Sequence, residues 1–166
     1  MKTFISYFGR LDLIEILYKE EPNLFTLDNS MLKIAAISNN VHIVNFIIKN
    51  IPQVKRDKSI IDAACSFGCF DVLKFLHENN YESCSNSALE SAAFKGLFNI
   101  CEYLLRNKMC EVTSQSLDFA CNRGHIDIVR LLFHADKKFG YMAYTENSLY
   151  NAVENNHVKV FEFLYR

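Results

Sequence analysis

The apolar and polar positions of this chain follow one pattern that returns about every 30 residues. Each copy begins with an apolar residue and, three positions later, an alanine, a spacing that places both on one face of a helix. A Gly or Asn follows, and then a second segment dense in Ile, Val, Leu and Phe. Five copies align without a gap: LKIAAISNNVHIVNFI (32–47), IDAACSFGCFDVLKFL (61–76), LESAAFKGLFNICEYL (89–104), LDFACNRGHIDIVRLL (117–132) and LYNAVENNHVKVFEFL (149–164).

A sixth copy, KTFISYFGRLDLIEIL (2–17), matches in its second half alone, as terminal repeats often do. The turn position holds only Gly or Asn, the residues that best tolerate the left-handed backbone of a helix C-cap. We therefore expect a first helix to end there and a second helix, apolar on a wide face, to follow. N-caps are predicted at Ser30, Ser59 and Ser87. The turn residues are Gly9, Asn39, Gly68, Gly96, Gly124 and Asn156, spaced by 30, 29, 28, 28 and 32 residues.

The order of residues in each copy resembles the ankyrin repeat. A pair of small residues is followed by Gly, then by His, and then by a segment rich in Ile, Val and Leu, most clearly in FACNRGHIDIVRLL (119–132). The resemblance covers essentially the whole chain and rests on six aligned copies. It implies an all-α fold, an ankyrin-like solenoid of stacked antiparallel helix pairs, as a single domain over residues 1–166. The expected repeats are approximately 1–29, 30–58, 59–86, 87–114, 115–145 and 146–166.

The copies depart from the family pattern in two ways. The usual Thr-Pro-Leu-His opening is replaced by segments such as SMLK (30–33), and the units are shorter than the usual ~33 residues. The missing residues fall between units, in loops such as HENNYESCSN (77–86), where ankyrin repeats extend a β-hairpin. We therefore expect little or no β-hairpin. Short repeats rich in Asn, Lys, Ile and Phe are similar to those of giant-virus and amoebal ankyrin proteins.

Composition and charge limit the class of protein. The chain has 166 residues, half of them apolar, and a net charge of −1, which predicts a soluble globular protein with a sizeable core. Charges at Arg10, Asp12 and Glu15 interrupt the start, where a signal peptide needs an apolar stretch. We expect an intracellular, cytoplasmic protein, in the host cytoplasm if the chain is viral, with neither a membrane nor a nucleic acid as partner.

Two of the six cysteines occupy a position that other copies fill with alanine. Cys65 and Cys121 align with Ala36 and Ala93, so we interpret them as small core residues. The number of cysteines requires no disulfide framework in a chain of this size. Cys65, Cys69 and His77 lie close in sequence but lack a fourth ligand, so we expect no zinc site.

Two histidines directly follow a turn. His125 and His157 match the turn histidine of ankyrin repeats, a resemblance that implies hydrogen bonds to neighbouring loops rather than catalysis. The chain contains no nucleophile elbow, phosphate loop, HExxH or paired-carboxylate motif. We therefore expect no enzyme and no cofactor.

The two residues before each turn vary most between copies. Stacking uses the core positions of such a repeat protein, so the exposed ends of the first helices and the loop tips line its concave side. We expect a monomer that binds a protein partner there. The candidate contact residues are Tyr7, Phe8, Ile37, Phe67, Phe94, Lys95, Asn122, Arg123, Glu154 and Asn155.

Two alternatives remain open at this point. Phe67 and Phe94 either pack against the next repeat's first helix or form an exposed aromatic strip with the rings about 10 Å apart, the spacing of packed helices. The function is either that of an interaction module or that of a targeting fragment of a larger effector or ubiquitin-ligase adaptor. A start inside a degenerate repeat would correspond to a fragment.

Overall fold

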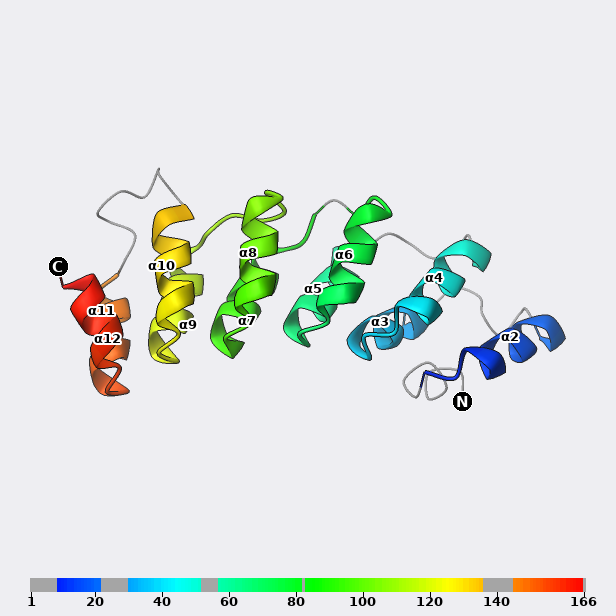
Figure 1. Cartoon of the computed structure of the whole chain (residues 1–166), viewed down its shortest axis with the longest axis horizontal. Coiled ribbons are helices and arrows are strands. Elements are labelled where there is room, and N and C mark those ends of the chain that lie inside the picture. Colours follow the sequence, from blue (N-terminus) through cyan, green and yellow to red (C-terminus); the bar gives the residue numbers. More distant parts are fainter. Residues whose placement is uncertain (1–8, 22–29, 52–56, 82, 136–144, 166) are drawn as a thin grey trace. The chain divides into compact units, whose positions relative to one another are not determined.

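The computed structural model describes residues 9–21, 30–51, 57–81, 83–135 and 145–165. In these ranges the chain forms eleven α-helices and no strand (Figure 1), which confirms the predicted all-α fold with little β-structure. The contacts divide the chain into two compact units, Met1–Ser83 and Cys84–Arg166.

The first unit contains α2 and two helix pairs. In each pair the helices contact each other, α3 with α4 and α5 with α6. Between the pairs, the first helices contact each other, α3 with α5, and so do the second helices, α4 with α6. The helices are α2 (Leu11–Glu20), α3 (Ser30–Ile37), α4 (Val41–Asn50), α5 (Lys58–Ser66) and α6 (Phe70–Glu78).

The second unit contains three helix pairs stacked in sequence order. First helices contact first helices, from α7 to α9 to α11, and second helices contact second helices, from α8 to α10 to α12. The result is two layers of helices with the core between them. The helices are α7 (Asn86–Lys95), α8 (Phe98–Arg106), α9 (Ser114–Asn122), α10 (Ile126–Ala135), α11 (Glu146–Glu154) and α12 (Val158–Leu164).

The backbone at the turn positions is left-handed throughout. All six predicted turn residues have positive φ, between 54° at Asn39 and 78° at Gly68, which confirms the repeat register. The residue after the turn donates its N–H to the carbonyl five positions back, as in His125 to Ala120 at 3.0 Å, so the helix end is satisfied in the manner of a Schellman motif. Left-handed Asn80 and Lys108, at the ends of second helices, were not predicted.

The core is formed by the positions that the pattern marked as apolar or small. Leu89, Ala92 and Ala93 of α7 are fully buried, and so are Cys65 and Cys121, as expected of small core residues. The predicted N-caps were wrong. α5 is capped by Asp57, whose carboxylate accepts the N–H of Ser59, so the helix begins before Ser59. Ser30 and Ser87 likewise lie inside α3 and α7.

Burial makes the core thiols unreactive. Desolvation raises the pKa of Cys101 and of Cys121 to about 12, and for Cys121 the nearby Asp118 carboxylate adds to the effect. A thiol reacts as the thiolate, so both remain protonated at pH 8. We expect iodoacetamide at pH 8 to alkylate Cys110, which is half-buried, well before these two, as measured by peptide mass spectrometry. All six should react in guanidinium, and fast labelling of Cys121 in the folded protein would contradict the buried assignment.

Candidate partner-binding surface

The predicted contact residues lie at the C-terminal ends of the first helices. Tyr7 and Phe8 are outside the described residues, and the others end α3, α5, α7, α9 and α11 directly before the left-handed turn. Four of the charged or polar members, Lys95, Arg123, Glu154 and Asn155, are exposed. We call the set the pre-turn row: Ile37, Phe67, Phe94, Lys95, Asn122, Arg123, Glu154 and Asn155.

The following repeat holds the backbone of the pre-turn row at Phe94 and at Asn122. His125 donates from Nε2 to the carbonyl of Phe94 at 3.3 Å, and His157 donates to the carbonyl of Asn122 at 3.0 Å. A carbonyl can only accept, which fixes the ring nitrogen as the donor. The predicted bridging role of both histidines is confirmed. The row therefore has a defined backbone on which its side chains are displayed.

Cys69 performs the same task in the first unit, which sequence reasoning missed. Its Sγ donates to the carbonyl of Ile37 at 3.3 Å, and the residue stands at the N-cap of α6 as His157 stands at the N-cap of α12. Its alignment with the two histidines was the available signal. Burial raises the pKa of the Cys69 thiol, which keeps the S–H that donates.

The bridging histidines also explain two of the glycines. A Cβ added to Gly96 would lie 2.6 Å from Cε1 of His125, and a Cβ added to Gly124 would lie 2.6 Å from Cε1 of His157. Both glycines have positive φ as well, 77° and 72°. These positions need glycine for the backbone conformation and for the close approach of the next repeat.

The two aromatic members of the row differ. Phe94 is half-buried, with its ring edge-on to Phe119 of α9 at 5.5 Å and the guanidinium carbon of Arg123 4.1 Å from its centroid. Phe94 thus packs against the next repeat's first helix. Phe67 has 61% of its surface exposed. The two residues belong to different units, so the spacing of about 10 Å between their rings remains a prediction.

A ladder of polar contacts between repeats was not predicted. Thr113 caps α9 and donates from Oγ1 to Glu90 of the preceding repeat at 2.8 Å. One repeat later, Thr145 caps α11 and donates to Asp118 at 2.8 Å, and buried Ser148 donates to the same carboxylate. The signal was Thr-x-x-Ser before each helix, a capping-box pattern, together with an acidic residue at a fixed place in the preceding copy.

In the first unit an electrostatic interaction between charged residues stands at the same two positions. Lys33 takes the position of Glu90 and Asp118, and the cap of the next repeat is Asp57. The pKa of Asp57 is lowered, first by hydrogen bonds from Ser59 and then by the charge of Lys33. The first helix of one repeat therefore complements the cap of the next in both units.

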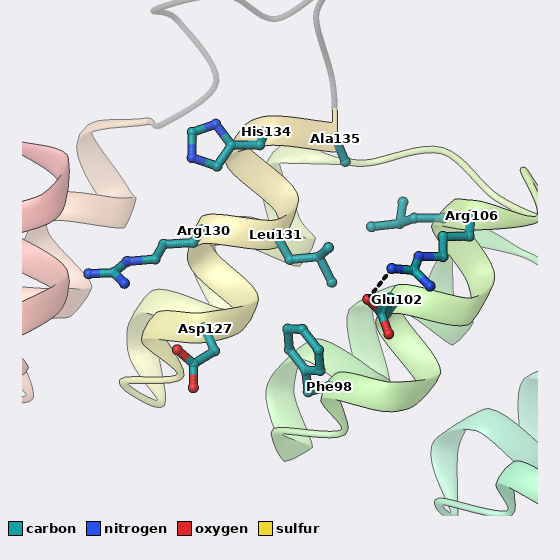
Figure 2. A pocket seen from close by; sticks show the side chains of 9 residues that line it. Phe98, Glu102, Arg106, Asp127, Arg130, Leu131, His134 and Ala135 are labelled. Atoms are coloured by element: carbon teal, nitrogen blue, oxygen red, sulfur yellow. Dashed lines mark ion pairs between the residues drawn. The ribbon is translucent and has the colours of Figure 1, made fainter.

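The second unit also has a pocket of about 620 Å³ between α8 and α10 (Figure 2). Phe98 and Leu131 point into the space between the two helices, whereas Arg130 points away toward α12. Glu102 pairs with Arg106 at 2.9 Å on the rim. This pocket lies on second helices, unlike the pre-turn row, and the sequence pattern did not predict it. Its lining is Phe98, Glu102, Leu105, Arg106, Asp127, Arg130, Leu131, His134 and Ala135.

The described residues do not assemble a metal site. Within them, no three His, Cys, Asp or Glu side chains are placed to hold one ion together. Cys65 and Cys69 are both buried. No helix among the described residues is both long and apolar enough to span a membrane.

These features define a helical repeat protein. Helix pairs stack on one another, a left-handed turn joins the two helices of each pair, and a residue of the next pair hydrogen-bonds to the helix before the turn. The family profile described as ankyrin repeats (three copies) matches residues 32–116 and 89–166, and the chain belongs to the ankyrin repeat family. The membership confirms the resemblance found in the sequence.

The proteins similar to this chain include a viral ankyrin repeat protein and a human ankyrin repeat domain. An ankyrin repeat protein of Acanthamoeba polyphaga mimivirus is 31% identical over 86 residues, which is 52% of this chain and 26% of that protein. The chain thus spans about a quarter of the length of this relative. The crystal structure of the human ASB11 ankyrin repeat domain matches with a TM-score of 0.75 at 19% identity, over 99% of this chain and 81% of that one. The latter likeness concerns the fold alone.

Proposed function

We propose that this protein is a non-catalytic interaction module that binds a protein partner through the pre-turn row, on the concave side of its ankyrin repeats. Ankyrin repeats generally serve in protein–protein interaction. The observation that carries the proposal is the pair of histidine bridges at 3.3 and 3.0 Å, which fix the backbone of the row at Phe94 and Asn122, while the side chains of the row differ from one repeat to the next. A surface that is already ordered loses less entropy on binding.

The side chains of the row support protein recognition. Phe67 is an exposed aromatic residue, the type that dominates binding energies at interfaces. The guanidinium carbon of Arg123 lies 4.1 Å from the centroid of the Phe94 ring, so this side chain is positioned before a partner arrives. Lys95 and Arg123 present cations in successive repeats, whereas Glu154 presents an anion in the last one. Such a charge pattern favours one register of a complementary partner.

Affinity capture with paired variants tests the proposal. The double change Lys95→Glu with Arg123→Glu should reduce capture of the protein's partner about tenfold or more, because it reverses two exposed charges in the row. The matched control, Arg106→Glu with Arg130→Glu, reverses two cations on the second helices α8 and α10 and should leave capture unchanged. Phe67→Ala should cost about 2 kcal/mol of binding and little stability. Loss of capture in the control alone would place the site at the pocket.

A further inference from the structure

The α8–α10 pocket has a smaller side chain where the next interface has an aromatic ring. In that next interface, Phe163 of α12 packs against α10, with its ring 5.4 Å from the ring of Phe133 and 5.6 Å from the guanidinium carbon of Arg130. The repeat frame aligns Phe163 with Leu131 of α10, which faces α8 in the same way. Leucine fills less space than phenylalanine, and the pocket of about 620 Å³ lies beside Leu131 (Figure 2).

The lining of the pocket is apolar and accessible. Phe98 has 37% of its surface exposed, Leu105 and Leu131 are half-buried, and Ala135 is exposed. The volume falls in the range of about 300–1,000 Å³ that is usual for binding sites. An apolar hollow with charged residues around it is typical of an interaction site.

The charges of the pocket differ between its two ends. Asp127 lies in the first turn of α10 and forms no ion pair within the part of the chain that the structure describes. Arg106 and His134 lie in the last turns of α8 and α10, and the two helices run in the same direction (Figure 2). Glu102 takes one nitrogen of Arg106, and a guanidinium has five N–H donors, so Arg106 can bind a second carboxylate. The pocket therefore has an acidic end and a basic end.

We propose that the α8–α10 pocket binds an amphipathic helix of a partner protein, antiparallel to α8 and α10. A helix favours acidic residues in its first turn and basic residues in its last turn. In the antiparallel direction its basic last turn meets Asp127, and its acidic first turn meets Arg106. Its apolar residues, at positions i, i+4 and i+7, insert between Phe98 and Leu131. This site lies on second helices and is independent of the pre-turn row.

A labelled helical peptide tests the proposal by fluorescence anisotropy. The probe is a stapled peptide of about 14 residues with glutamates in its first turn, leucines at i, i+4 and i+7, and lysines in its last turn, because an unstapled helix of this length is marginal. The wild-type chain should bind it with a Kd of about 100 µM or tighter. A peptide with the glutamates and lysines exchanged should bind about fivefold more weakly, and Asp127→Lys should reverse this preference.

Leu131→Phe tests whether the peptide enters the pocket. The larger ring should fill the pocket as Phe163 fills the next interface, so the peptide should bind about tenfold more weakly while the melting temperature stays within a few degrees of wild type. The matched control is Val153→Phe, which adds a ring at an exposed position of α11 and should leave binding unchanged.

Three results would overturn the proposal: a wild-type chain that does not bind the peptide, equal binding of the two peptides, or equal binding by wild type and Leu131→Phe. An apolar dye such as anilinonaphthalene sulfonate that binds where the peptide does not would assign the pocket to small molecules, and would overturn it too. Lys95→Glu with Arg123→Glu should leave peptide binding unchanged, since both residues lie in the pre-turn row. Failure of this site is thereby distinguishable from failure of the proposed function.

Discussion

Gly124→Ala should lower the free energy of unfolding by about 2–4 kcal/mol, a large effect for a single methyl group. A left-handed backbone costs a residue with a Cβ about 1–2 kcal/mol, and φ at Gly124 is 72°. The added methyl group would also overlap the ring of His157, and overpacking costs about 1–3 kcal/mol. Urea denaturation followed by circular dichroism measures the sum.

A double-mutant cycle separates the two causes. His157→Ala removes the ring that the methyl group meets, so Gly124→Ala should cost less in that background, with a coupling of about 1–2 kcal/mol. The strain of the left-handed backbone remains in both. Equal costs with and without His157 would show that the close approach of the histidine does not explain the glycine.

Asp118→Ala should destabilise the last repeat by about 2–3 kcal/mol, the typical cost when hydrogen bonds to a charged group are lost and buried donors remain. Both Thr145 and fully buried Ser148 donate to this carboxylate. Hydrogen exchange should therefore accelerate in α11 and α12 before it does in α7 and α8. Asp118→Asn keeps one acceptor and should cost about half as much.

The matched control for this substitution is Asp127→Ala. Asp127 is an exposed carboxylate on the neighbouring helix α10, so its removal should change stability by about 0.5 kcal/mol or less. If Asp118→Ala proves as mild as Asp127→Ala, the ladder does not join the last two repeats energetically.

The sequence predicted the helix pairs and their turns because both depend on local physics. Alanine three residues after an apolar position marks a buried helix face, and Gly or Asn marks a left-handed end. Asn39 and Asn156 conform as well as the glycines do, with φ of 54° and 58°. Lys108 was missed because a lysine has no preference for positive φ, and only the packing around it imposes the conformation.

The contacts between repeats could be predicted where the same residue type recurs in each copy. They could not be predicted where different residue types make the contact in different copies. His125 and His157 were identified, but Cys69 makes the same kind of bond with a thiol. In the second unit a carboxylate accepts a hydrogen bond from a threonine at these positions, whereas in the first unit the charge of Lys33 acts on the Asp57 carboxylate. Complementarity between two positions is conserved there, which a search for one recurring residue does not detect.

The pocket between α8 and α10 and the exposure of Val153 could not be predicted from the repeat pattern, for a different reason. Both depend on which side chains the neighbouring helices leave uncovered. Val153 fits the pattern of a core residue, and its exposure follows from the absence of a following helix pair over α11 among the described residues. Exposure of that kind is a property of the assembled stack, whereas the pattern reports only the helix to which a residue belongs.

The central claim is that the pre-turn row binds the partner, and hydrogen–deuterium exchange tests it most directly. Exchange would be followed by mass spectrometry for the chain alone and for the chain saturated with a captured partner. The account predicts slower exchange at residues 94–97, 122–125 and 154–157 of the complex, with little change in α8 and α10. Protection confined to α8 and α10, with the row exchanging as fast as in the free chain, would contradict it.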